Sequence, residues 1–191
     1  RINAYGEKRG ILVEHYIISS GLREIIEGTA IAKDFTHIYA SSFYYNEHGE
    51  PCWPAQVINY TNKTQFLFRI EKGILDINDN AVNDHFAEGE LRVPFRNIVY
   101  IGDSATDIPC MRLVNSLGGH SVGVYDLENT ASKDTVRRMI RDERIRYYVP
   151  ADYTKGSEMD ILIHRIIDKT AAYEVLEGKH LRDRKEAIGL K

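Results

Sequence analysis

The sequence predicts an α/β fold, a Rossmann-like parallel sheet with helices on both faces. Segments with the apolar pattern of strands alternate along the 191 residues with segments that have the pattern of helices. The strand segments are nearly continuous apolar runs, as expected for parallel strands that are covered on both faces. No repeat interrupts the alternation, and the length suits one α/β core. We expect a core domain at residues 1–175 and a charged helix or tail at residues 176–191.

The first half of the chain predicts a strand, a short helix, a hairpin and a longer helix. Residues 11–18 are apolar and partly β-branched, which predicts a buried strand, and Ser19-Ser20-Gly21 would end it in a tight turn. Turn residues at 46–51 separate two segments rich in Tyr, Phe, Val and Ile, which predicts a hairpin. In chain order the predicted elements are strand 11–18, helix 22–27, hairpin strands 36–45 and 56–60, and helix 63–72 with Asn62 or Thr61 as its N-cap.

The second half continues the alternation with three strands and three helices. In chain order the predicted elements are strand 97–101, helix 109–117, strand 121–125, helix 132–143, strand 147–149 and helix 157–175. In open parallel sheets the ligand lies beyond the carboxyl ends of the strands. Ser19 and Asp103 both fall at such ends, so we expect a site there.

The composition argues against several classes of protein. Hydrophobic residues make up 43% of the chain and charged residues 28%, as in soluble globular proteins. The formal net charge of -3 does not favour a nucleic-acid partner, and no apolar run approaches the roughly 20 residues of a membrane span. The given residues show no pattern typical of a signal peptide, and Cys52 and Cys110 lack metal-site spacing. We therefore expect a cytoplasmic protein with no nucleic-acid or membrane partner.

The segment Ile98 to Pro109, Ile-Val-Tyr-Ile-Gly-Asp-Ser-Ala-Thr-Asp-Ile-Pro, carries the clearest chemical pattern. A buried strand delivers Gly102 and Asp103, and Asp107 follows where the next helix begins. Glycine permits a sharp turn and close approach of the backbone to a ligand. Two carboxylates near one point suit Mg²⁺, which is held by one or two carboxylates plus a phosphate. The alternative is that Asp107 only caps the next helix.

Two further positions could contact a phosphate. Ser19, Ser20 and Gly21 place a hydroxyl and amides at the end of a strand and the start of a helix, where N–H groups and positive potential favour anions. Lys63 at the start of a helix is unfavourable for the helix dipole, which is easier to understand if it neutralises a phosphate and a carboxylate. The alternatives are an ordinary Ser-Gly turn and a solvated surface lysine.

The order of these three patterns resembles motifs two, three and four of the haloacid-dehalogenase-like superfamily. The segment Gly102 to Pro109 is especially similar to the phosphoserine-phosphatase-like branch, and the resemblance covers residues 11–150. It implies that Ser19, or less favourably Ser20, hydrogen-bonds the transferring phosphoryl group and that Lys63 stabilises the charge shared by nucleophile and phosphate. It further implies that Asp103 binds Mg²⁺, directly or through water, and that Asp107 supports the metal. Family members hydrolyse phosphomonoesters through an aspartyl-phosphate.

The sequence departs from this family at its beginning. The first motif of the family, Asp-x-Asp-x-Thr/Val after the first strand, supplies the nucleophile, and no Asp-x-Asp occurs here. The nearest pattern, Asp76-Ile77-Asn78-Asp79, has the wrong spacing and follows the Lys63 helix. We therefore expect the first strand, the first motif and any helical cap to lie upstream and this chain to be inactive alone. The neighbours of a missing central strand would expose apolar surface, which predicts aggregation, self-association through the exposed sheet, or support by another chain.

Two other functions compete with a phosphatase of small phosphorylated substrates. A non-catalytic binding or scaffold protein could use the same fold, because fold alone does not fix function. An unrelated dinucleotide- or nucleotide-binding domain would need a glycine-rich first turn, and neither Gly-x-Gly-x-x-Gly nor Gly-x-x-x-x-Gly-Lys-Ser/Thr occurs.

Overall fold

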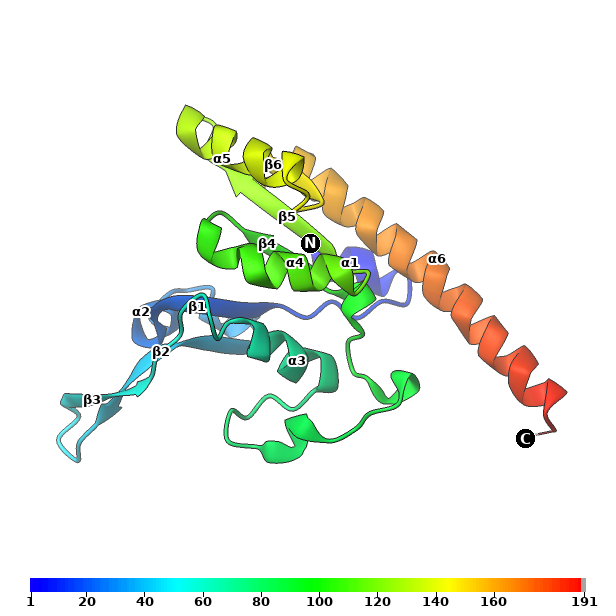
Figure 1. Ribbon diagram of the computed structural model, residues 1–191, viewed down its shortest axis with the longest axis horizontal. Helices are drawn as coiled ribbons and strands as arrows, with labels where there is room; N and C mark the ends of the chain where they lie inside the picture. The colour runs from blue at the N-terminus through cyan, green and yellow to red at the C-terminus, as the bar shows by residue number, and fades with distance from the viewer. Residues whose placement is uncertain (190–191) are drawn as a thin grey trace. The chain divides into compact units, whose positions relative to one another are not determined.

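The computed structural model describes residues 1–189, with the side chain of Glu88 left out. The chain is of the α/β class and contains a parallel sheet flanked by helices, as the sequence predicts (Figure 1). It divides into two compact units, Arg1–Val13 with Ala151–Lys191 and Glu14–Pro150. Each unit is described by itself.

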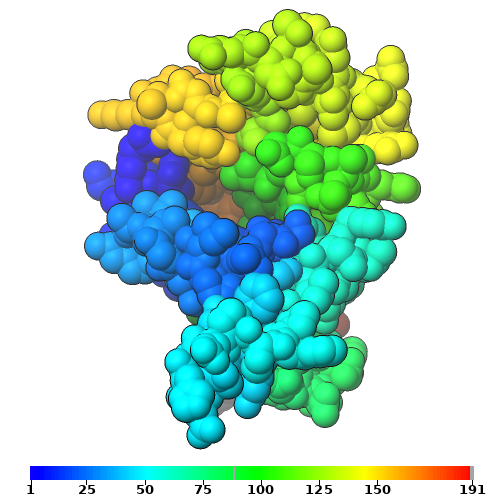
Figure 2. All heavy atoms as spheres, turned by 90° about the vertical axis from the view of Figure 1, so that its left-hand side faces the viewer, coloured from blue at the N-terminus to red at the C-terminus, as the bar shows by residue number. Residues whose placement is uncertain are grey.

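The first sheet of the unit Glu14–Pro150 is built from β1 (Tyr16–Leu22), β2 (His37–Tyr45) and β3 (Pro51–Gln56), in that spatial order. β1 runs parallel to β2, and β2 and β3 form an antiparallel hairpin. The short helix α2 (Arg23–Glu27) and the 3₁₀ turn η1 (Ala32–Asp34) connect β1 to β2, and α3 (Thr64–Lys72) follows the hairpin. The hairpin, in cyan, projects from the body of its unit (Figure 2).

The second sheet contains β4 (Val99–Gly102), β5 (His120–Tyr125) and β6 (Tyr147–Pro150), all parallel. The 3₁₀ turn η5 (Ala105–Asp107) and α4 (Ile108–Ser116) connect β4 to β5, and α5 (Thr130–Arg141) connects β5 to β6. These are two consecutive βαβ crossovers, the unit from which Rossmann-like sheets are made.

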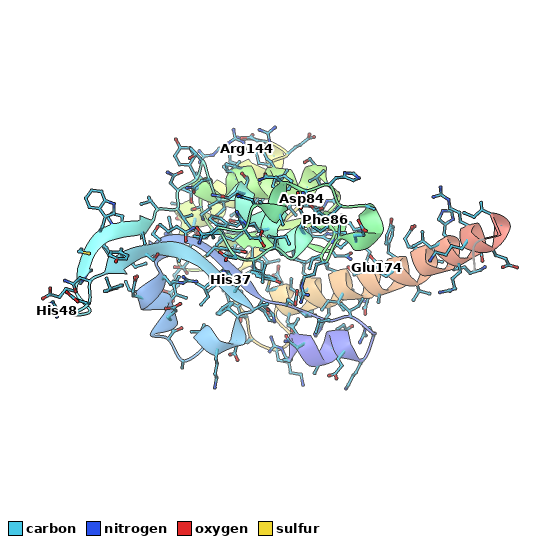
Figure 3. All side chains as sticks on the ribbon, turned by 90° about the horizontal axis from the view of Figure 1, so that it is seen from below. His37, His48, Asp84, Phe86, Arg144 and Glu174 are labelled. Atoms are coloured by element: carbon cyan, nitrogen blue, oxygen red, sulfur yellow. The ribbon has the colours of Figure 1, made fainter. Side chains whose placement is uncertain are left out.

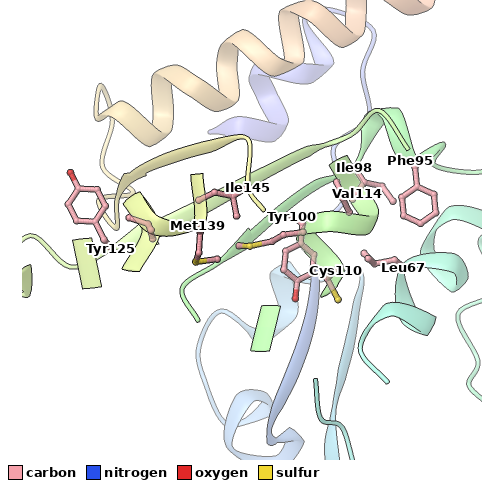
Figure 4. Packing of buried hydrophobic residues seen from close by; sticks show 11 residues of the cluster. Leu67, Phe95, Ile98, Tyr100, Cys110, Val114, Tyr125, Met139 and Ile145 are labelled. Carbon is pink, nitrogen blue, oxygen red and sulfur yellow. The ribbon is translucent and has the colours of Figure 1, made fainter. Parts of the chain in front are cut away.

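The main hydrophobic core packs around the second sheet. All six residues of β5 are buried, because this strand is paired on both sides. The core cluster contains Leu67, Phe95, Ile98, Tyr100, Cys110, Met111, Val114, Tyr125, Val136, Met139 and Ile145 (Figure 4). A smaller cluster of Tyr39, Ile58, Phe66 and Ile70 lies under the first sheet. Ile18 of β1 packs against both clusters, so the two sheets share one interior.

The two sheets are not joined by hydrogen bonds between strands. In the described part of the chain β1 is paired only with β2, and β4 only with β5, which leaves one unpaired edge on each. No residue of β1 is fully buried, and Ile101 of β4 is 41% exposed. The strands at the opposite ends of the two sheets carry prolines, Pro51 and Pro54 in β3 and Pro150 in β6, which hinder pairing. β1 and β4 carry neither prolines nor charged residues.

The segment between α3 and β4 is held by two cations of α3. The buried Arg69 guanidinium donates to the carbonyl oxygens of Asp76, Ile77 and Asp79 at 2.6, 2.8 and 3.1 Å. The Lys72 ammonium donates to the carbonyl oxygens of Val82 and Asp84 at 2.7 and 2.8 Å, and Phe86 lies 5.2 Å from it (Figure 3). The segment contains three 3₁₀ turns, η2 (Asn80–Asn83), η3 (Glu88–Glu90) and η4 (Phe95–Asn97).

The second unit consists of α1 (Ile2–Glu7) and the 30-residue helix α6 (Glu158–Ala187) with their flanking segments. The Tyr5 ring stacks on His164 at 3.7 Å, and its hydroxyl donates to Asp168 at 3.0 Å. The Arg9 guanidinium pairs with Asp168, and its Cζ atom lies 3.5 Å from the centroid of the Tyr5 ring. No helix in the described part of the chain has both the length and the apolarity needed to cross a membrane.

Several predicted boundaries are wrong. The first strand begins at Tyr16 instead of residue 11, because its partner strand begins opposite Tyr16, at His37. The second hairpin strand lies at Pro51–Gln56 instead of 56–60, since prolines are tolerated on this exposed edge. The N-cap of α3 is Lys63, because the Asn62 side chain is used inside the preceding loop, where it accepts from Asn59 N at 2.8 Å. The helix predicted at residues 157–175 continues to Ala187 as α6.

Candidate functional site

A buried group of polar side chains lies where β4 ends. Asp107 occupies the last position of η5, directly before α4, and is 6% exposed. It lies against Gly102, because a Cβ atom added there would come within 2.8 Å of the Asp107 Cβ, Cγ and Oδ2 atoms. The glycine of the Gly-Asp pattern therefore makes room for the second aspartate of the same pattern.

Each oxygen of the Asp107 carboxylate accepts two hydrogen bonds. Oδ1 accepts from the Lys63 ammonium at 2.7 Å and from the Tyr100 hydroxyl at 2.9 Å. Oδ2 accepts from the Ser104 hydroxyl at 3.0 Å and from the Ser104 backbone N–H at 3.4 Å. An ionised carboxylate offers about four acceptor positions, so this one is fully used.

Lys63 reaches this group from the start of α3. The residue is 5% exposed, which is rare for a lysine. The start of a helix disfavours a positive charge, and burial removes the hydration of the ammonium. The ion pair with Asp107, with Nζ and Oδ1 2.7 Å apart, offsets both costs. The placement of the Lys63 ammonium is therefore explained by its ion pair with Asp107 and not by exposure to solvent.

The environment sets the ionisation of this group. Burial alone would raise the pKa of Asp107, but the hydrogen bond and charge of Lys63, with the donors on Tyr100 and Ser104, hold that pKa below its ordinary value. Burial, together with Asp107 and Cys110, raises the pKa of the Tyr100 hydroxyl well above its ordinary value. Burial also raises the pKa of the Cys110 thiol to about 11. At neutral pH the group therefore contains one carboxylate with neutral phenol and thiol neighbours.

Ser19, Ser20 and Gly21 do not form the tight turn that the sequence predicts. They belong to β1, which continues to Leu22, and they form an irregularity in its pairing with β2. The Gly21 N–H donates to the Ser19 hydroxyl at 3.0 Å, and Ser20 and Gly21 are exposed. The helix that follows, α2, has only 5 residues. Their role as a phosphate cradle stays a prediction, and it would depend more on the exposed strand end than on a helix.

Asp103 is exposed directly after the carboxyl end of β4, and its carboxylate makes no hydrogen bond or ion pair with other described residues. Within residues 1–189, leaving out the Glu88 side chain, no three His, Cys, Asp or Glu side chains are grouped to hold a metal. Asp103 alone fits the way Mg²⁺ is held by one carboxylate, a phosphate and water. Asp107 would have to give up a hydrogen bond to become a ligand, so it fits a supporting role.

The structure brings Lys63 and Asp107 into direct contact, although 44 positions separate them. No hydrogen bond between described residues connects Ser19 or Asp103 to this pair. The sequence interpretation missed Tyr100 and Ser104, which complete the surroundings of Asp107. A tyrosine within the aliphatic strand Ile98-Val99-Tyr100-Ile101 was the available sign, since a buried phenol usually needs a polar partner.

Comparison with known proteins does not name a family. No protein family model matches the chain. A curated protein of Borreliella burgdorferi, described as an uncharacterized protein, is 24% identical over 172 residues, which cover 83% of this chain and 59% of that protein. The chain therefore spans less than two thirds of the length of this relative.

Proposed function

We propose that this chain is part of a Mg²⁺-dependent phosphatase of the haloacid-dehalogenase-like superfamily, in its phosphoserine-phosphatase-like branch. The enzyme would hydrolyse a small phosphorylated substrate through an aspartyl-phosphate. The observation that carries the proposal is the buried ion pair between Lys63 and Asp107, with Nζ and Oδ1 2.7 Å apart. It joins two of the three resembling motifs at the end of β4, where a parallel sheet binds its ligand.

Each residue has a defined task in this proposal. Lys63 would use the N–H groups that do not bond to Asp107 to neutralise the phosphoryl oxygens, and Asp107 would hold that ammonium in place. The Ser19 hydroxyl would hydrogen-bond the phosphoryl group, with Ser20 and Gly21 beside it. Asp103 would hold Mg²⁺, which supplies charge neutralisation at the phosphate when it is bound.

The unpaired strand edges also support the resemblance. β1 and β4 are parallel-sheet strands with one open edge each, and both lack the prolines found in β3 and β6. The resemblance predicts one further strand between them, which would carry the Asp nucleophile. No Asp-x-Asp is present in this chain, so we propose that it does not turn over substrate alone.

The same open edges favour self-association of the isolated chain. An apolar, unprotected strand edge is a template for pairing with a second copy. We expect oligomers in sedimentation velocity experiments, and fewer of them for Ile101→Lys, which places a charge on β4. A monodisperse monomer would contradict this partner proposal. We also propose a cytoplasmic location, which the free thiols of Cys52 and Cys110 support.

The test combines turnover with phosphate binding. The 21.9 kDa chain should not hydrolyse p-nitrophenyl phosphate with or without Mg²⁺. With Mg²⁺ present it should bind inorganic phosphate in calorimetry, and Lys63→Met should remove that binding. Lys72→Met, on the same helix but bonded to carbonyl oxygens, is the matched control and should keep it. Turnover by the chain would overturn the assignment of the nucleophile to another segment.

A non-catalytic binding or scaffold protein is the second candidate. The observation that favours it is the absence of Asp-x-Asp from the sequence. A chain that binds no phosphate in the same calorimetric experiment would support this function and contradict the phosphatase.

A further inference from the structure

Tyr100 lies on β4, two residues before the Gly-Asp pattern, and is 8% exposed. Its hydroxyl donates to Asp107 Oδ1 at 2.9 Å, the same oxygen that accepts from Lys63 at 2.7 Å. The ring lies next to Cys110 in the core cluster (Figure 4). A phenylalanine would fill this core position equally well, so packing alone does not explain the hydroxyl.

The hydroxyl fixes the direction of the carboxylate. Ser104 holds Oδ2 from the turn after β4, while Tyr100 holds Oδ1 from within the strand. With donors from two separate backbone positions, the carboxylate cannot rotate about its Cβ–Cγ bond without losing a bond. The Lys63 ammonium has three N–H groups, and the direction of the one used for Asp107 determines where the other two point.

We propose that Tyr100 is a positioning residue, which orients the Lys63 ammonium toward bound phosphate by fixing the Asp107 carboxylate between them. This inference rests on the proposed function, because it deepens the role of Lys63 in anion binding. The phenol itself does not touch the phosphate. Its effect passes through the two hydrogen bonds that meet on Asp107 Oδ1.

The experiment compares Tyr100→Phe with Tyr39→Phe in the full chain. Tyr39 is the matched control, since it is 1% exposed and its hydroxyl also donates one hydrogen bond, to the Leu75 carbonyl oxygen at 3.0 Å. The first measurement is the Lys63 side-chain ¹H–¹⁵N ammonium resonance, assigned by its loss in Lys63→Met. The second is the affinity for inorganic phosphate in the presence of Mg²⁺.

Tyr100→Phe should shift the Lys63 resonance and weaken phosphate binding about tenfold, the effect of one hydrogen bond to a charged group. Tyr39→Phe should leave both measurements unchanged. An unmoved Lys63 resonance in Tyr100→Phe would overturn the inference, as would equal losses of phosphate affinity in both variants. A shifted resonance in a protein that binds no phosphate would instead leave the positioning of Lys63 intact and contradict the proposed function.

Ser104→Ala provides a second variant in case Tyr100→Phe does not fold. It removes the hydroxyl donor to Oδ2 but keeps the backbone N–H donor and both donors on Oδ1. We expect the Lys63 resonance to remain close to its wild-type position in this variant. A large shift of the Lys63 resonance in Ser104→Ala would mean that the Tyr100 phenol does not fix the Asp107 Oδ1 atom, and the inference would fail.

Discussion

The buried pair of Lys63 and Asp107 predicts an unequal response to removal of either partner. Asp107→Leu leaves the ammonium of Lys63, a residue that is 5% exposed, with no other hydrogen-bond acceptor among the described residues. Such an unpaired buried charge costs about 4 kcal/mol of the free energy of unfolding. Lys63→Met leaves a carboxylate that still accepts from Tyr100 and twice from Ser104, so we expect about 2 kcal/mol. Replacing both charges together should bring the free energy of unfolding to within about 1 kcal/mol of wild type.

The assay is urea unfolding at pH 7, followed by far-ultraviolet circular dichroism, for the wild type, both single variants and the double variant. The slope against urea should stay constant, so that midpoints report stability. The cycle isolates the interaction of the pair, because the double variant removes both charges at once. Single variants that each cost under about 1 kcal/mol and add up in the double variant would refute the buried pair. Equal costs for the two single variants would refute the contribution of Tyr100 and Ser104.

Three further changes have defined outcomes. Gly102→Ala places a Cβ atom 2.8 Å from Asp107, so it should lower the thermal midpoint and shift the Lys63 resonance. Asp107 has a lowered pKa because its donors outweigh burial, so its contribution is complete above the unfolded pKa of about 3.9 and is lost as the pH falls through the folded pKa. Between pH 6 and pH 3 the free energy of unfolding should therefore fall more for the wild type than for the double variant Lys63→Met/Asp107→Leu. An equal fall in both proteins would contradict this. Arg69→Met frees the carbonyl oxygens of Asp76, Ile77 and Asp79, among others, so amide hydrogen exchange should accelerate in residues 76–84 and stay unchanged in β5.

The local pattern of the sequence was sufficient for the elements of the second sheet. The bounds of β4, β5 and β6 lie within two residues of the predicted strands 97–101, 121–125 and 147–149. These strands belong to βαβ crossovers, where each strand is apolar throughout and the intervening helix has its own apolar stripe. The information needed to place them is therefore contained within each segment.

The site was predictable only as a set of residue types. Lys63 contacts the Asp107 carboxylate, while its role beside a nucleophile and a phosphate stays a prediction. The bonds from Tyr100 and Ser104 depend on how the chain turns after β4, and no spacing rule describes that turn. For Ser19 to Gly21 the local sequence predicts the wrong structure. Their composition indicates a turn, but pairing with β2 keeps them in an irregular strand, because strand pairing can override local preference.

The limits of β1 could not be inferred from its own residues, because sheet pairing joins segments that are distant in sequence. Residues 11–13 are as apolar as a strand, yet pairing begins at Tyr16, where His37 is available opposite. The unpaired edges of β1 and β4 also show that the residues of a strand do not by themselves determine its pairing. Their residues are those of covered strands, without prolines or charges, although each has one partner in the described part of the chain. We propose that β1 and β4, which have the sequence of covered strands but the exposure of edge strands, pair with an additional strand. The segment that carries the catalytic aspartate in the proposed enzyme would have that place.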